Sequence, residues 1–186
     1  MENERRLEIL GILLISLSIF VLVSLTGYEP AEEPSISKNV QITNPMGILG
    51  VFTSYYLIKR GFGYLSIIIP FISLLCGWFL FAKKDLEKII RFSTYAFFIL
   101  FISSVTIGVF VNSVFPDSPD RYTASGEIGG VVGKLFIDWL SLWGTILLLI
   151  TSYLLVFRSY FDINYYGPFA YIKNKFNVWS KENMIK

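Results

Sequence analysis

The segment GEIGGVVGKL at residues 126–135 places a lysine after a glycine-rich run, and these residue types can cradle a phosphate. A phosphate loop needs the spacing G-x-x-x-x-G-K followed by Ser or Thr, whose hydroxyl binds magnesium. Counting back from Gly133, the required first glycine falls on Ile128, and Leu135 rather than a hydroxyl residue follows Lys134. No apolar strand precedes the segment. The pattern therefore argues against nucleotide binding.

Other side chains that could carry chemistry are sparse. The chain has no histidine, which removes the commonest general base and metal ligand, and its single cysteine, Cys76, cannot form an internal disulfide. Glu32 and Glu33 are adjacent carboxylates, but they lie in a proline-rich stretch, where we expect them to be solvated. We therefore predict no catalytic residue, no metal and no cofactor, and a protein that is not an enzyme.

The composition indicates a membrane protein. Hydrophobic residues make up 54% of the 186 residues and charged residues 16%, with a mean hydropathy of +0.59, whereas a soluble domain carries about 25% charged residues. A helix needs about 20 apolar residues to cross the hydrocarbon core. The fourth apolar run, 142–157, reaches that length only if Trp139 and Leu140 are included. We predict an all-α membrane protein with four transmembrane helices at about residues 7–26, 62–82, 92–111 and 139–157.

Lysines and arginines are distributed unevenly among the connections. If the N-terminus is cytoplasmic, eleven of the 16 lie on the cytoplasmic side, as the positive-inside rule requires. We therefore predict a multi-pass protein of the cytoplasmic membrane with both termini inside. Glu8, one turn inside the first span, is expected to extend to the interface. The short inner connection KKDLEKIIR supplies four cytoplasmic basic residues: Lys83, Lys84, Lys88 and Arg91.

The C-terminal segment differs in composition from the apolar spans. We assign residues 1–160 to a membrane domain and residues 161–186 to a cytoplasmic juxtamembrane tail. Basic residues with interleaved aromatics bind single-stranded nucleic acid in some proteins, but next to a membrane the same pattern binds anionic lipid headgroups. The position of the tail favours lipid.

The two outer loops end alike. In each, a G-x-x-G opens an aromatic-rich stretch and a further glycine precedes the next span. The G-x-x-G at residues 47–50 matches that at residues 130–133. Gly63 matches Gly144 in the same way. One explanation is a duplicated two-span unit, related by an axis along the membrane normal, with a short outward amphipathic helix in each half.

The glycines of this repeated pattern have two possible roles. They either allow two helices to approach closely, as small residues do in membranes, or only break the loop before a helix. Aromatic residues of the two outward helices are expected to anchor them at the membrane interface. The candidate helix-packing residues are Gly47, Gly50, Gly63, Gly129, Gly130, Gly133 and Gly144, and the candidate interface anchors are Tyr55, Tyr56, Trp139 and Trp143.

The order and spacing of these motifs resemble the four-span N-terminal membrane domain of the FtsK/SpoIIIE DNA translocases, over roughly residues 5–160. The stretch LTGYEPAEEPS is similar to the start of the family's first outer loop, S-Y-x-P-x-D-P-S. The two glycine-rich stretches are similar to the family's N-x-x-G-x-x-G and GG-x-x-G units. The matching residues are Tyr28, Pro30, Pro34, Ser35, Asn44, Gly47, Gly50, Gly63, Pro70, Gly129, Gly130, Gly133 and Gly144.

The resemblance implies a membrane anchor and oligomerisation domain for a DNA translocase at the division septum, in cell division and chromosome segregation. Its implied partners are membrane lipid, further copies of itself and division proteins. No Walker motif or DNA-reading domain is present in these residues, so DNA would be reached only through an attached motor. Two alternatives stay open: a small transporter or channel subunit, and a division scaffold without a motor.

Overall fold

The computed structural model describes residues 2–34, 41–116, 122–161 and 165–167, and within these ranges every regular element is helical. Most of the predicted tail, 161–186, lies outside the described residues. Two short 3-10 helices, Pro30–Glu32 and Gly63–Ile67, and a π-helix, Tyr55–Phe62, lie between the longer elements. The α-helices are α1 (Glu2–Thr26), α2 (Gly47–Ser54), α3 (Ile68–Phe81), α4 (Leu86–Val114) and α5 (Tyr122–Phe161).

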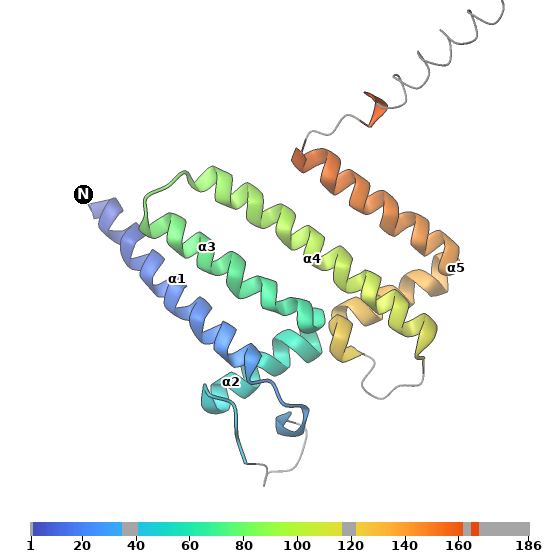
Figure 1. Cartoon of the computed structure of the whole chain (residues 1–186), viewed down its shortest axis with the longest axis horizontal. Coiled ribbons are helices and arrows are strands. Elements are labelled where there is room, and N and C mark those ends of the chain that lie inside the picture. The colour runs from blue at the N-terminus through green and yellow to red at the C-terminus, as the bar shows by residue number, and fades with distance from the viewer. Residues whose placement is uncertain (1, 35–40, 117–121, 162–164, 168–186) are drawn as a thin grey trace, which may run out of the picture.

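Four helical segments are long and apolar enough to cross a membrane: 5–26, 47–81, 86–114 and 122–161. The prediction of an all-α protein with four transmembrane helices is confirmed. In Figure 1, α1, α3, α4 and the last part of α5 form one layer of neighbouring helices. The N-terminus, the connection between α3 and α4 and the end of α5 lie on one side of this layer, and α2 with the loop after α1 lies on the other. This other side is called outward below, after the sequence prediction.

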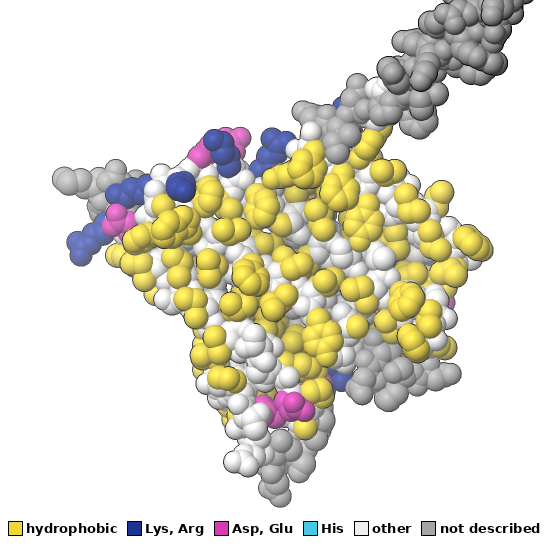
Figure 2. Space-filling model, in the orientation of Figure 1, with side chains coloured by type: hydrophobic (Ala, Val, Ile, Leu, Met, Phe, Trp, Pro, Cys, Tyr) yellow, Lys and Arg dark blue, Asp and Glu magenta, His cyan; other side chains and the backbone are white. Residues whose placement is uncertain are grey.

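The surface has the polarity of a membrane protein. Apolar side chains cover the middle of the molecule, and lysines and arginines gather along the edge on which the N-terminus lies (Figure 2). Leu147 and Leu155, for example, are 71% and 64% exposed. Such exposure is stable in a lipid solvent, which does not penalise apolar surface.

The connection between α3 and α4 is shorter than predicted. The expected connection was KKDLEKIIR, residues 83–91, with four basic residues. The observed connection contains only two of them, because α4 already begins at Leu86. The side chain of Asp85 accepts a hydrogen bond from the backbone N–H of Glu87 at 3.1 Å, which caps the new helix. Lys88 and Arg91 therefore lie on the first turns of α4, and this helix is longer than the predicted span of 92–111.

The outward parts of the chain are interrupted where the backbone enters the left-handed region. These positions are Gly47, Gly63, Gly126 and Ser141, with φ of 62°, 68°, 69° and 56°. Gly47 and Gly63 are sixteen residues apart, whereas Gly126 and Ser141 are fifteen apart. The π-helix Tyr55–Phe62 lies between the first two and accommodates one extra residue.

This pairing of breaks gives the two halves a different register from the one expected. By the positions of these breaks, Gly47 corresponds to Gly126 and Gly63 to Ser141, so neither the match of residues 47–50 to residues 130–133 nor that of Gly63 to Gly144 agrees with the structure. The break at Ser141 was not expected, because it falls inside the predicted fourth span, residues 139–157. Trp139 therefore belongs to the outward segment 127–140, and the last span starts at Leu142 and gains its length at its other end, up to Phe161.

Each half contains one close helix pair. In the first half, α1 and α3 approach through Gly11 and Gly77, where a Cβ on Gly11 would lie 2.8 Å from the carbonyl oxygen of Gly77. In the second half, α4 packs on α5 through a small apolar cluster in which Val105 and Val109 are almost fully buried beside Leu149. Close backbone approach and small apolar contacts thus hold the spans together.

Candidate functional site

The two halves meet where their outward helical segments break. Residues 61–63 lie against residues 124–126, backbone against backbone. A Cβ on Gly63 would overlap the carbonyl group of Ala124, and a Cβ on Gly126 would overlap that of Gly61. Gly63 and Gly126 also have positive φ. Glycine is required at both positions by conformation and by space.

A row of glycines on segment 127–140 faces α4. A Cβ on Gly129 would overlap Ser104, and a Cβ on Gly133 would lie 2.8 Å from the backbone nitrogen of Val109. Gly108 of α4 faces Gly129 equally closely. Apolar residues of this segment lie on more than one side of it: Val131 is 50% exposed, whereas Val132 and Phe136 pack against the cluster that contains Val105 and Val109 of α4.

The other candidate packing glycines have different surroundings. Gly130 lies against the ring of Tyr122, and Gly50 lies against the side chain of Asn44. Gly144 is close only to Leu140 of its own helix, and no atom would lie within 4 Å of a Cβ on Gly47. The glycine spacing alone therefore did not distinguish the glycines that meet another helix from those that do not.

Two asparagine side chains, the buried Asn44 and the partly buried Asn112, bond backbone carbonyls close to the breaks. The amide Nδ2 of Asn44 donates to the carbonyl oxygens of Ser24 and Gly27, both at 3.0 Å. In the second half, Nδ2 of Asn112 donates to the carbonyl oxygen of Gly130 at 2.8 Å. The amide of each half thus satisfies backbone carbonyls near a break. Asn112 was missed in the sequence because only its position in space marks it.

The hydroxyl of Ser104 has a similar role. Its Oγ donates to the carbonyl oxygen of Ser125 at 2.6 Å, directly before the break at Gly126. Both serines are fully buried. This bond ties α4 to the start of α5.

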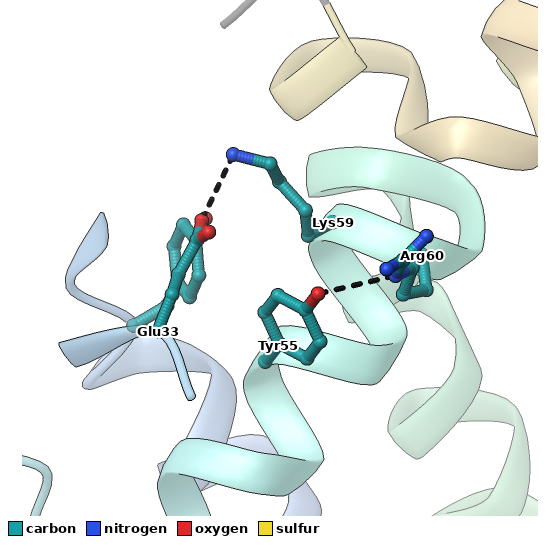
Figure 3. Close-up of polar contacts among 5 residues, drawn as sticks. Glu33, Tyr55, Lys59 and Arg60 are labelled. Atoms are coloured by element: carbon teal, nitrogen blue, oxygen red, sulfur yellow. Dashed lines mark hydrogen bonds and ion pairs between the residues drawn. The ribbon is translucent and has the colours of Figure 1, made fainter. Parts of the chain in front are cut away.

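The acidic loop departs from the prediction. Glu32 and Glu33 were expected to be solvated, but their side chains are only 8% and 7% exposed. The loop after α1 folds back onto the π-helix, where Lys59 Nζ lies 3.0 Å from Glu33 Oε1 (Figure 3). Tyr28 donates to the same carboxylate at 2.7 Å. The prediction was wrong because the proline-rich composition does not reveal this fold-back.

Glu32 is held by hydrogen bonds across the same loop. Its Oε1 accepts from both the side-chain hydroxyl and the backbone N–H of Thr43. The hydroxyl of Thr43 is the main cause that lowers the pKa of Glu32; burial opposes it, and backbone hydrogen bonds from Thr43 and Asn44 add to it. The carboxylate is therefore the favoured form in the folded loop.

One ion pair joins the two halves directly. Arg60 Nη1 lies 2.6 Å from Glu127 Oε2, and Arg60 Nε donates to Tyr55 Oη at 3.1 Å, as Figure 3 shows for the tyrosine. Arg60 and Glu127 flank the backbone junction formed by residues 61–63 and 124–126.

The aromatic candidates for interface anchoring lie on the outward parts of both halves. Tyr56 is 60% exposed, Trp139 is 78% exposed and Trp143 is 80% exposed, whereas Tyr55 is half-buried beside Arg60. The two tryptophans flank the break at Ser141. Their exposure leaves them available to membrane lipid.

The basic candidates lie on the opposite side of the helical layer. Lys83 Nζ is 3.0 Å from a carboxylate oxygen of Glu8, which reaches the helix end as expected. Lys84 lies over the ring of Phe79, and Lys88 is 3.5 Å from Asp85. Arg91 lies over the ring of Tyr160 at the end of α5. In the part of the chain that the structure describes, no cluster of His, Cys, Asp and Glu could hold a metal ion.

Comparison with known protein families identifies the family of this chain. The family described as the 4TM region of DNA translocase FtsK/SpoIIIE matches residues 3–170 of the chain. No curated protein and no solved structure matches it.

The contact between Gly108 and Gly129 should be intolerant of even one methyl group. We expect Gly108→Ala to destabilise the protein by about 1–3 kcal/mol, the usual cost of overpacking, because the new Cβ would overlap the carbonyl of Gly129. Unfolding by sodium dodecyl sulfate in mixed micelles, followed by circular dichroism, measures the change. Gly167→Ala, where no atom lies within 4 Å of the new Cβ, is the matched control and should be neutral; equal loss in both variants would contradict the assignment.

The ion pair between Arg60 and Glu127 should couple the two halves. We expect the single reversals Arg60→Glu and Glu127→Arg each to lower the unfolding midpoint, and the double reversal to recover most of it. The recovery should shrink at high salt, since this pair is exposed. A double variant no better than the worse single variant would exclude the coupling.

The buried carboxylate of Glu32 should make the outer loop sensitive to acid. Because its pKa is lowered below the ordinary 4.5, its stabilising effect is present above that pH and is lost as the pH falls through the lower, folded value. The midpoint for thermal unfolding, measured from neutral pH downward, should fall less steeply in Glu32→Gln than in the wild type. Glu29→Gln changes an exposed acid of the same loop; if it flattens the profile as much, Glu32 is not responsible.

Proposed function

Because this chain belongs to the family of the 4TM region of DNA translocase FtsK/SpoIIIE, we propose that it is a membrane anchor and oligomerisation domain for such a translocase in cell division and chromosome segregation. The observation that carries the proposal is the family match over residues 3–170. It coincides with four helical segments long enough to span a membrane. Anchoring is the role that these residues can perform without a motor.

The arrangement of the chain ends supports an anchor. The N-terminus and the end of α5 lie on the same side of the helical layer (Figure 1), and this is the side rich in lysine and arginine. By the positive-inside rule this side is cytoplasmic. A motor joined after α5 would then lie in the cytoplasm, where chromosomal DNA is, and the membrane domain itself would not touch DNA.

Self-association is the second part of the proposal. The family implies a motor that works as a ring, so several anchors must gather in one patch of membrane. The lipid-exposed faces of the spans offer the surface for this, with Leu13 60% exposed on α1 and Leu147 71% exposed on α5. We propose a septal location in the cytoplasmic membrane, together with other division proteins.

Cross-linking tests the association in native membranes. The single cysteine, Cys76, is replaced by serine, and one cysteine is placed at Leu13 or at Leu147. We expect a bifunctional maleimide to give covalent dimers from at least one of these single-cysteine variants, and species larger than dimers from a variant that carries cysteine at both Leu13 and Leu147, because one thiol per chain can be linked to only one other chain. A cysteine at Leu100, which is 1% exposed, is the control and should stay monomeric. Monomers alone at every position would refute oligomerisation.

Location and transport separate the remaining alternatives. A fluorescent fusion of the full chain should concentrate at the division site; an even distribution around the cell would refute the septal role. Purified protein in liposomes should give no solute flux above that of empty vesicles. Flux would instead favour a transporter or channel, for which the apolar grooves between α4 and α5 offer no polar path.

A further inference from the structure

The last span of α5 does not close fully against α4. Two grooves lie between these helices, one of about 410 Å³ toward the outward side and one of about 460 Å³ toward the side of the N-terminus. Tyr153 lies between them, since its Oη is within hydrogen-bond distance of the hydroxyls of Ser103 and Thr106. The second groove, here called the basic-side groove, is lined by residues 91–98 of α4 and 155–159 of α5.

The basic-side groove has a charged mouth and an apolar floor. Arg91 and the hydroxyl side chains of Thr94 and Ser159 lie at or near the helix ends, and Phe98 and Leu155 lie deeper along the spans. The volume of the groove falls within the 300–1,000 Å³ typical of ligand sites. A ligand that fits must therefore be anionic at one end and apolar at the other.

Arg91 is oriented by its neighbours but not neutralised by them. Its guanidinium carbon lies 6.0 Å from the centroid of the Tyr160 ring, and its Nη2 donates a long hydrogen bond of 3.4 Å to the carbonyl oxygen of Tyr160. Tyr95 packs edge-on against the same ring at 5.2 Å. Within the described residues no carboxylate pairs with Arg91. Most of its N–H donors remain available for a phosphate, which guanidinium binds in a bidentate manner.

The level of the groove in the membrane identifies the occupant. Its mouth lies at the same helix ends as Lys83, Lys84 and Lys88, on the edge where basic side chains gather (Figure 2). Anionic headgroups are found at this level, and basic pockets between transmembrane helices bind them. A free phosphate would use Arg91 but leave the apolar floor exposed.

We propose that the basic-side groove is a binding site for one anionic phospholipid, whose phosphate is held by Arg91 and whose acyl chain lies between Phe98 and Leu155. The hydroxyl of Ser159, which lies 2.5 Å from Tyr95 Oη, supplies a further donor to the headgroup when Tyr95 donates to it, whereas the hydroxyl of Thr94 donates to the carbonyl oxygen of Ile90 at 2.9 Å. The bound lipid fills the space between α4 and the end of α5, and so fixes the direction in which the chain leaves the membrane. This site is independent of the proposed role as a translocase anchor.

Native mass spectrometry of the full chain in detergent tests the proposal. The probes are phosphatidylglycerol and phosphatidylcholine with identical acyl chains. We expect the wild type to retain one phosphatidylglycerol in preference to phosphatidylcholine, and Arg91→Gln to reduce this retention roughly fivefold or more, the effect of about one basic contact at a membrane surface. Lys88→Gln removes the same charge one turn away, outside the groove, and should reduce retention by much less.

A second variant tests the apolar part of the site. Thr94 is exposed at the groove, so Thr94→Phe should fill it without disturbing the core and should also displace the lipid. Equal loss in Arg91→Gln and Lys88→Gln, or equal retention of the two lipids, would overturn the proposal. If inorganic phosphate competes fully and Thr94→Phe has no effect, the site binds a free anion and the lipid assignment is wrong.

Discussion

The structure depends on the requirement that a helix broken in an apolar environment must satisfy its freed backbone groups within the protein. Two of the four left-handed breaks, at Gly63 and Gly126, lie against backbone of the other half, and directly before a third, at Gly47, the backbone N–H of Met46 donates to the side chain of Asn44. Asn44, Ser104 and Asn112 bond carbonyl oxygens at or near these breaks. The polar interior of the protein is thus concentrated on its outward side, and the spans themselves need little more than apolar packing.

The same requirement explains how the two halves are joined. Contacts between the halves are more extensive at the outward segments, where α5 meets the π-helix and the 3-10 helix that follows, than along α3 and α4. The backbone of residues 61–63 lies against that of residues 124–126, and Arg60 pairs with Glu127 beside it. Two similar helical units therefore share one polar and glycine-rich junction, while their membrane-spanning parts stay largely separate.

The spans could be predicted because the length of an apolar run is set by the thickness of the bilayer and is read directly from the sequence. The breaks could not be placed in the same way. Ser141 adopts a conformation usually reserved for glycine, so the neighbouring Gly144 was taken for the matching break. Contacts between distant residues were equally invisible: Arg60 and Glu127 are separated by 67 positions, and the burial of Glu32 depends on a fold-back to Thr43. Local pattern fixes helices, but contacts between helices depend on three-dimensional packing.

The junction of glycines has a consequence for how such a sequence can vary. Where backbone touches backbone, as at Gly63 and Gly126, a side chain would overlap the facing main chain, so we expect only glycine to be tolerated at these positions. The lipid-facing positions can exchange leucine, isoleucine, valine and phenylalanine freely, because lipid accepts them all. A sequence with this fold can therefore change at most lipid-facing positions while its junction glycines stay in the same order. The stretch that matches the family, residues 3–170, contains both sides of this junction.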